Sequence, residues 1–436
     1  MFGIFPRSQV TRRAFLAKVG AFSALSAGGL CSATSVCLGR GGLSISEAFD
    51  AEMDRFMSAR KVPGGALAVV KAGRLVYARG YGRADREREE PVKAESLFRI
   101  ASLSKPVTSA AIMRLVDSGR LSLDNHVVQI LPVEPVVPDG KEVDPRLKGI
   151  TIRQLLQHTG GWNRDVSGDP MFRSVQIARA VGMPAPARPD AIIRYMFGQP
   201  LDFAPGTRYA YSNFGYCLLG RVIEKVAGLG YEDFVRQEVL GRMGIRQMRL
   251  GKTLARERAP GEVRYYTPSD RKGTSVFRAE PGRVPVPYGT FCLEAMDAHG
   301  GWLASAVDLA RFAAAMDAPD AQNLLKPETR SSIYQPPAAP VSRNAEGKLA
   351  DHYYGAGWSV RPVGNNGRAN YWHTGSLPGT FTLLVRRHDG LSWAVLFNQR
   401  SEDSKLPDGA IDSAMHRAAD AVAEWPDKDL FEVRSQ

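Results

Sequence analysis

Strand-like segments stand at both ends of this 436-residue chain, with a mostly helical stretch between them. Near the start, residues 64–71 and 75–82 read as two strands of a hairpin joined by the turn 72–74. Three further segments near the end alternate as strands do, namely 371–373, 380–387 and 393–399. Because strands must pair with other strands, this order predicts an α/β (α+β) fold in which one antiparallel sheet is built from both chain ends.

Helical periodicity accounts for most of the remaining chain. The spacing of apolar residues predicts a first helix over 45–60 and a last one over 410–425. Further helices are predicted at 102–118, from 152 onward, and at 217–228, 231–240 and 306–316. Pro- and Gly-rich segments at 131–149, 259–290 and 336–348 are predicted to be long loops.

Residues 41–436 are therefore expected to form a single domain. Its sheet lobe would comprise about 41–105 and 350–436, with helices flanking the sheet, and the helical lobe would be inserted between them at about 106–349. A hydrophobic content of 44% is enough to build a large core for a domain of this size.

The first forty residues differ from the rest in composition. They contain five basic residues and no Asp or Glu. The pair Arg12-Arg13, followed by a weakly apolar stretch at 19–38, resembles a twin-arginine export signal. We therefore expect 1–40 to be a cleaved signal and the mature protein to be periplasmic or extracellular; the alternative is a short anchoring helix.

Composition also limits the partners. The formal net charge is +12, but the basic residues are spread along the chain without long blocks, so we expect no nucleic-acid partner. No 18-residue run is apolar enough for an internal membrane span, and we expect none after signal removal. After residues 1–40 the chain has only two cysteines, Cys217 and Cys292. Two cysteines do not make a disulfide framework, and their spacing is not that of a metal site.

Ser102-Leu103-Ser104-Lys105 at the start of a predicted helix offers a nucleophile and a base together. Residues three apart lie on one helix face, so the Lys105 amine can reach the Ser102 hydroxyl. The helix start adds free backbone N–H groups where an oxyanion would form. The pattern alone is weak, because Ser269-Asp270-Arg271-Lys272 also matches it; lying in a predicted loop, that second copy is interpreted as chance.

The order of motifs is more specific than any single one. Tyr211-Ser212-Asn213 follows Ser102 in the chain, and His373-Thr374-Gly375 comes later, beside a predicted edge strand. This order resembles the class C beta-lactamases, the related DD-peptidases and the family VIII carboxylesterases. Further segments similar to the family surround these motifs, at 155–161, 203–220 and 300–312, so the resemblance covers about 45–425.

The resemblance implies a role for each motif. Ser102 would become acylated, while Lys105 and Tyr211 would handle its proton, with the Tyr211 pKa depressed by the nearby cationic Lys105. Asn213, together with the segment His373, Thr374 and Gly375, would bind the substrate. The oxyanion hole would be formed by the backbone N–H groups of Ser102 and Ser376. His158 lies in a segment that is structural in this family, so a catalytic role is not expected for it.

Rival chemistries lack their motifs. The chain has no Gly-x-Ser-x-Gly elbow with the serine in the right place, no paired-His zinc pattern and no Gly-rich phosphate loop. The predicted site therefore needs no metal and no cofactor.

The substrate is less constrained than the chemistry. Histidine at position 373, where most beta-lactamases of this class have lysine, suits a lactam carboxylate poorly, since histidine titrates near neutrality. The expected substrates are small esters first, then D-amino-acid peptides or amides of cell-wall type, then beta-lactams. A non-enzymatic alternative is a penicillin-sensing or scaffold protein, which the presence of Ser102, Lys105 and Tyr211 disfavours. The oligomeric state is not predicted.

Overall fold

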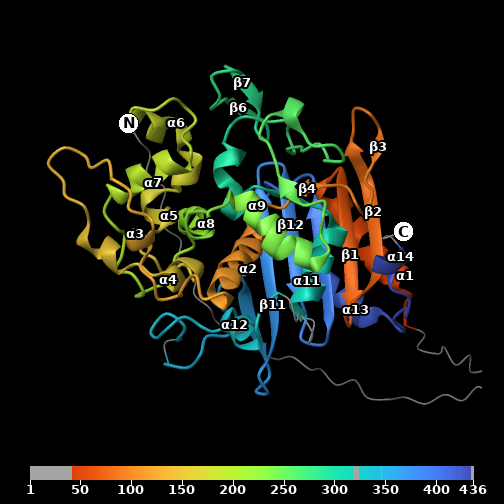
Figure 1. Cartoon of the computed structure of the whole chain (residues 1–436). Helices are drawn as coiled ribbons and strands as arrows, with labels where there is room; N and C mark the ends of the chain where they lie inside the picture. The colour runs from red at the N-terminus through yellow and green to blue at the C-terminus, as the bar shows by residue number, and fades with distance from the viewer. Residues whose placement is uncertain (1–41, 318–323, 345, 434–436) are drawn as a thin grey trace, which may run out of the picture. The chain divides into compact units, whose positions relative to one another are not determined.

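The main element of the fold is an antiparallel sheet of eight strands (Figure 1). The computed structural model describes residues 42–317, 324–344 and 346–433, so the predicted export signal at 1–40 lies outside the described residues. The strand order is β3-β2-β1-β13-β12-β11-β10-β9, which joins both chain ends in one sheet and confirms the predicted fold class. The strands are β1 (Gly64–Lys71), β2 (Arg74–Asp85), β3 (Glu90–Pro91), β9 (Tyr353–Tyr354), β10 (Ser359–Val363), β11 (Arg368–Leu377), β12 (Thr380–Arg386) and β13 (Leu391–Phe397).

The predicted hairpin and the three predicted C-terminal strands all occur, with β2 and β11 longer than expected. Between β1 and β2, Ala72 and Gly73 both have positive φ, at 47° and 81°, which is the backbone geometry of a two-residue hairpin turn. The short strands β9 and β10 were not predicted. They extend the sheet beyond β11, so β11 is not its edge strand; β10, however, pairs only with residues 368–372, and His373 lies beyond that pairing.

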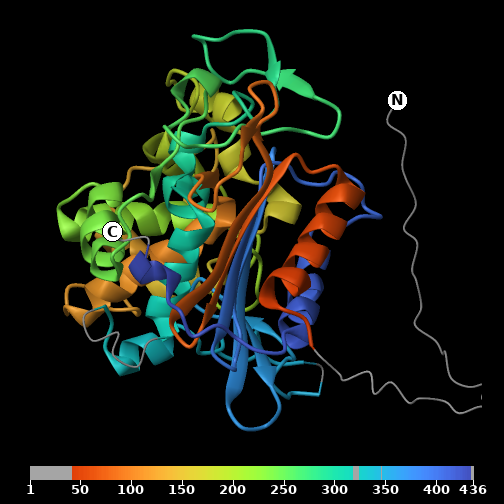
Figure 2. The same ribbon diagram turned by 90° about the vertical axis from the view of Figure 1, so that its right-hand side faces the viewer.

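Side chains of the central strands alternate between two hydrophobic clusters, one on each face of the sheet. In β1, Ala66 and Ala68 belong to one cluster, whereas Leu67 and Val69 belong to the other. The helices α1 (Ile45–Arg60) and α13 (Ala410–Ala421) cover the second cluster's face (Figure 2). On the opposite face, α11 (Ala306–Asp317) packs against β1 and β13, so the stretch expected as a helical lobe also covers the sheet.

Two helices bring the chemical residues together. The helix α8 (Asn213–Ala227) begins four residues before its predicted start, because the Ser212 hydroxyl accepts a hydrogen bond from the N–H of Gly215 and caps the helix. It packs against α2 (Ser104–Asp117). Gly220 permits close packing with α10, since a Cβ there would lie 2.7 Å from that of Ala298. Because α2 and α8 pack against each other, their first turns lie close together.

The other described elements surround this pair. The helices are α3 (Val127–Ile130), α4 (Ile152–Leu156), α5 (Arg164–Ser167), α6 (Ser174–Ala180), α7 (Pro189–Phe197), α9 (Tyr231–Val235), α10 (Asp297–Gly300), α12 (Pro327–Ser332) and α14 (Leu430–Val433). A small sheet has the order β4 (Phe98–Arg99), β8 (Trp302–Ala304), β5 (Arg249–Leu250), and β6 (Lys272–Thr274) pairs with β7 (Arg283–Pro285). Within the described part of the chain, the search for a helix long and apolar enough to cross a membrane found none.

Candidate active site

A tightly held turn presents Ser102. It lies in a single 3-10 turn, Ala101–Leu103, directly before α2, rather than within the helix itself. Ala101 adopts a positive φ of 49°, which is unusual for a residue with a side chain. The carbonyl of Ile100, just before it, accepts a hydrogen bond of 2.9 Å from the Thr382 hydroxyl. The strained residue Ala101 thus stands directly before Ser102, and the residue before it is held by Thr382.

Buried Arg99 anchors the strand that leads into this turn. Its guanidinium donates hydrogen bonds to the backbone carbonyls of Pro287, Lys252 and Thr253, at 2.6 to 3.0 Å, and it lies near the Glu262 carboxylate. A fully buried charge is tolerated only when it is paired in this way. The position of Ser102 therefore depends on contacts from a segment more than 150 residues away.

Lys105 lies within reach of Ser102, as the spacing predicted. Its Nζ is 3.2 Å from Ser102 Oγ, 2.8 Å from Asn213 Oδ1 and 3.0 Å from the carbonyl oxygen of His299. The amide oxygen and the carbonyl can only accept hydrogen bonds, so they take two N–H groups of the amine. If the amine is neutral, its lone pair is left facing the Ser102 hydroxyl, which is the arrangement a general base requires.

Burial favours that neutral amine. The Lys105 side chain is completely buried, and burial lowers its pKa well below the ordinary value, with the nearby Arg164 cation lowering it further and the Asp169 carboxylate opposing. A lysine that loses its proton so readily can accept one from serine near neutral pH. Both the geometry and the lowered pKa are compatible with a general base at this position.

Tyr211 lies on the other side of the same serine. Both side chains line the same cavity, and Lys105 Nζ lies 4.7 Å from the Tyr211 ring centroid. The expected depression of its pKa is wrong for this structure: burial raises the Tyr211 pKa above the ordinary value, and the Ser102 side chain only opposes that rise. The raised pKa keeps the phenol protonated near neutral pH, so Tyr211 can donate a proton.

Asn213 is held from two sides. Its Oδ1 accepts from Lys105, and its Nδ2 donates to Asp169 Oδ2 at 2.6 Å. The carboxylate can only accept, so it fixes the amide with its oxygen toward the lysine. No predicted motif contains Asp169, which lies just before the 3-10 turn Pro170–Phe172. In the structure Asn213 contacts Lys105, and its predicted contact with the substrate stays a prediction.

His373 is buried and uncharged. Its Nε2 is 2.9 Å from the Tyr354 hydroxyl, and its Nδ1 is 2.6 Å from the Thr374 carbonyl oxygen. Because a carbonyl only accepts, Nδ1 carries the proton and Nε2 accepts from the tyrosine. Burial lowers the pKa of His373 to about 3. His373 therefore provides no cation, either for Tyr211 or for a substrate carboxylate.

Gly375 lets β11 approach the serine turn closely. A Cβ at this position would lie 2.1 Å from the carbonyl oxygen of Ile100 and 2.2 Å from Thr382 Oγ1, so no other residue fits without a shift. The next residue, Ser376, is exposed, and its Oγ accepts a hydrogen bond of 3.2 Å from Arg400. Ser376 and Ser102 line the same cavity, and the oxyanion hole formed by their backbone N–H groups stays a prediction.

A cavity of about 340 Å³ opens onto these groups. Of the predicted site residues it exposes Ser102, Tyr211, His373, Thr374 and Ser376, while Lys105, Asn213 and Gly375 are not among its lining residues. Sequence reasoning missed the other five, which are Arg164, Tyr209, Tyr354, Ser359 and Trp372. Only Tyr209 and Trp372 stand within two residues of a predicted motif.

His158 supports Tyr211 from behind, in line with the structural role expected for its segment. It is buried, its Nδ1 accepts from the N–H of Ser212 at 3.2 Å, and its ring centroid lies 4.3 Å from that of Tyr211. Burial lowers the His158 pKa well below its ordinary value. Among the described residues there is no cluster of three or more His, Cys, Asp or Glu side chains that could hold a metal ion.

The fold and this set of side chains define a class of protein, a hydrolase with the architecture of the serine beta-lactamases and penicillin-binding proteins. Residues 49–415 match the family described as Beta-lactamase, and the chain belongs to that family. This confirms both the predicted resemblance and the predicted class of enzyme, a serine hydrolase related to the beta-lactamases.

Individual relatives span several activities. Penicillin-binding protein 4* of Bacillus subtilis is 27% identical over 355 residues, 81% of this chain and 71% of that protein. Esterase EstB of Burkholderia gladioli is 33% identical over 189 residues, 42% of this chain and 46% of the esterase.

Solved structures share the fold. EstCE1, a hydrolase with promiscuous acyltransferase activity, aligns with a TM-score of 0.65 and 20% identity, over 87% of this chain and 98% of its own. The D-amino acid amidase of Ochrobactrum anthropi SV3 aligns with a TM-score of 0.64 and 22% identity, over 86% of this chain and 98% of its own. These similarities concern the fold alone.

Proposed function

We propose that this protein hydrolyses carboxylic esters through an acyl-enzyme on Ser102. The observation that supports this most is the Lys105 amine, 3.2 Å from Ser102 Oγ, with two fixed acceptors occupying its N–H groups. As the Ser102 oxygen forms its bond to the ester carbonyl carbon, its proton moves to Lys105. The carbonyl oxygen becomes an oxyanion, stabilised by the backbone N–H groups of Ser102 and Ser376.

Collapse of this intermediate expels the alcohol. The carbon–oxygen bond to the leaving group breaks, and the leaving oxygen takes the phenolic proton of Tyr211, which regains one from protonated Lys105. In the second half, water attacks the acyl carbonyl and gives a proton to the same pair, and Ser102 leaves with its proton restored. The site thus returns to its starting protonation without a metal or cofactor.

Esters come first among the substrates because of the proton donor. Burial raises the pKa of Tyr211, so this phenol is a weak acid. An amine leaving group must be protonated before it departs, whereas an alcohol or phenol of low pKa departs with less help. Neutral His373 also lacks the charge that would bind a lactam carboxylate. The relative named esterase EstB supports the same choice.

A second candidate is the cleavage of D-amino-acid peptides or amides, and one observation favours it. Arg164 lines the cavity with its guanidinium 4.8 Å from the Tyr211 ring centroid, and it forms no salt bridge with the residues that the structure describes. Such a cation could bind a peptide carboxylate. The relative named penicillin-binding protein 4* is consistent with this use.

A substrate panel tests the proposal. Nitrophenyl acetate, a D-Ala-D-Ala peptide and nitrocefin are compared on the mature protein and on Ser102→Ala. We expect turnover of the ester to exceed that of the other two and to vanish in the variant. Equal ester rates in both proteins would remove the assignment, and a dominant peptide rate would favour the second candidate.

We also propose that residues 1–40 export the protein, on the sequence evidence of Arg12-Arg13 before the apolar stretch 19–38. Fusing 1–40 to a reporter and replacing both arginines with lysine tests this in a bacterial host. Export of the first fusion and retention of the second are expected. Equal export of both would contradict a twin-arginine signal.

A further inference from the structure

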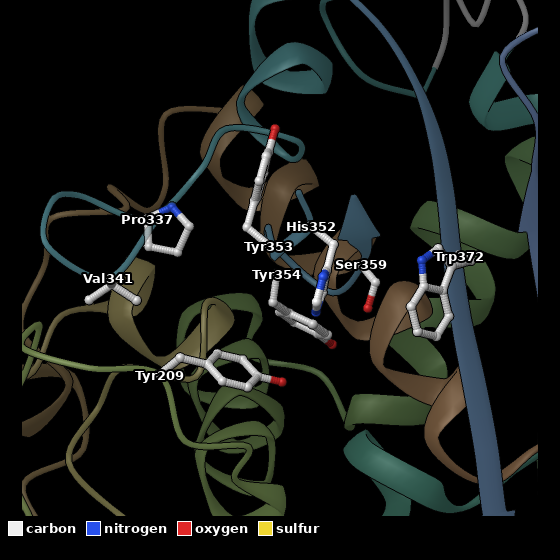
Figure 3. Close-up of a pocket in the computed structure, with 8 residues that line it drawn as sticks. All are labelled: Tyr209, Pro337, Val341, His352, Tyr353, Tyr354, Ser359 and Trp372. Atoms are coloured by element: carbon white, nitrogen blue, oxygen red, sulfur yellow. The ribbon is translucent and has the colours of Figure 1, made fainter. Parts of the chain in front are cut away.

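A second cavity adjoins the one that contains Ser102. It has a volume of about 280 Å³ and shares four lining residues with the first, namely Tyr209, Tyr354, Ser359 and Trp372. Figure 3 shows Pro337 and Val341 at one end and Trp372 at the other, with Tyr209 and Tyr354 between them. Because the two cavities share these residues, they are direct neighbours.

The lining of this second cavity is rich in aromatic side chains. Among its eight lining residues, four are tyrosine or tryptophan and none is Asp, Glu, Lys or Arg. A charged group entering it would lose water without gaining an ion pair, whereas an aromatic ring would find rings to pack against. A cavity of about 150 Å³ is enough for benzene, so this one holds a ring with substituents.

The position of the cavity relative to Tyr211 decides which part of the substrate enters it. The Tyr354 ring centroid lies 6.4 Å from that of Tyr211 and 5.6 Å from that of His373. Trp372 precedes His373 on β11, whereas Ser376, the expected oxyanion contact, follows it. Along β11 the cavity therefore lies on the side of His373 away from Ser376, beside Tyr354 and near Tyr211.

We propose that this second cavity binds the alcohol part of the substrate and that its preferred alcohols are aromatic, such as phenols and naphthols. The inference rests on the proposed ester hydrolysis and extends it to a substrate class. It agrees with the weak acidity of buried Tyr211, since aromatic alcohols leave with little proton transfer. Val341 then limits the size of the alcohol without touching the reacting atoms.

The test varies the alcohol and the acyl group separately. One series holds the acyl group as acetyl and compares methyl acetate with 2-naphthyl acetate; the other holds methanol and compares methyl acetate with methyl naphthylacetate. Val341→Trp fills the cavity and Val341→Ala enlarges it. Leu349→Trp is the matched control, an exposed position of the same loop region that lies outside this cavity's lining.

For Val341→Trp we expect kcat/KM for 2-naphthyl acetate to fall roughly ten- to hundredfold, with methyl acetate and the acyl series unchanged. Val341→Ala should raise the ratio of kcat/KM for 2-naphthyl acetate to that for methyl acetate. Leu349→Trp should leave this ratio unchanged. Unchanged ratios in both Val341 variants would overturn the inference, as would a shift confined to the acyl series, which would make this the acyl subsite.

A binding measurement keeps the two proposals separable. Absence of ester turnover by the wild-type protein would remove the proposed function but not the cavity. In that case the alcohol product 2-naphthol is titrated alone, with protein tryptophan fluorescence as readout because Trp372 lines the cavity. Saturable binding that Val341→Trp weakens is expected; binding that is absent, or equal in both proteins, would overturn the inference.

Discussion

The chain contains the pattern Ser-x-x-Lys twice, and the two copies have opposite surroundings. At 102–105 the lysine is completely buried, with the serine hydroxyl, an amide oxygen and a carbonyl around its amine. At 269–272 all four residues are exposed, Asp270 has a positive φ of 46°, and Lys272 begins the short strand β6. Spacing alone does not make a nucleophile; burial and fixed acceptors around the amine do.

The largest effect expected from this difference concerns the serines. Ser102→Ala should lower ester turnover by roughly three orders of magnitude or more, because no acyl-enzyme can form. Ser269→Ala should change it less than about twofold, as expected for an exposed residue away from the chemistry. Steady-state rates with nitrophenyl acetate measure both. Loss of turnover in the second variant would show that the exposed copy takes part.

Lys105 and Lys272 should differ in the same way as the two serines. Lys105→Ala should reduce the acylation rate by several orders of magnitude while far-ultraviolet circular dichroism stays unchanged, and Lys272→Ala should have no effect. Retained turnover in Lys105→Ala would contradict the base assignment.

The pH dependence of acylation follows from the same lysine. Burial lowers the Lys105 pKa well below its ordinary value, so wild-type kcat/KM should persist far below that value and fall only when acid protonates the amine. The value of kcat/KM must fall toward acid, since only the deprotonated amine accepts a proton. A pH–rate profile measures it, and a rate that rises toward acid would contradict the account.

A smaller effect is expected from the residue that orients Asn213. Asp169→Asn replaces an acceptor with a group that can also donate, so the Asn213 amide loses its fixed orientation and Lys105 loses a fixed acceptor. We expect kcat to fall roughly ten- to hundredfold with the acid limb of the pH profile displaced. Asp270→Asn in the exposed copy is the control. An unchanged pH profile would mean that Asp169 acts only on stability.

The smallest change is expected in substrate preference. His373→Lys adds a cation where the structure has a neutral imidazole, hydrogen-bonded to Tyr354 and the Thr374 carbonyl. The ratio of cephalosporin to ester turnover should rise severalfold, because a lactam carboxylate then gains a charged partner. An identical ratio in wild type and variant would show that position 373 does not select against lactams.

The sequence predicted those parts of the fold whose patterns are local. Alternation in β11, β12 and β13, and the hairpin of β1 and β2 with its turn at 72–74, marked the sheet. Strands β9 and β10 escaped notice because they are two and five residues long and one contains Pro362. Their pairing with each other and with β11 is a long-range property that no local pattern reveals.

In the site, too, the residues that a local pattern connects were predicted. Ser102 and Lys105 are neighbours on one turn, so their spacing sufficed, and the family resemblance added Tyr211. Arg164, Asp169 and the carbonyl of His299 reach the site only through the packing of distant segments. The direction of the Tyr211 pKa was wrongly expected for a related reason, since burial is set by the whole fold rather than by one neighbouring lysine.

Locating the covalent adduct tests whether surroundings rather than spacing create the nucleophile. The mature protein, Lys105→Ala and Lys272→Ala are treated with a fluorophosphonate, which reacts with activated serines, and the modified peptide is identified by mass spectrometry. We predict labelling of Ser102 in the wild-type and Lys272→Ala proteins and none in Lys105→Ala. Labelling of Ser269, or equal labelling of Ser102 without Lys105, would contradict the account.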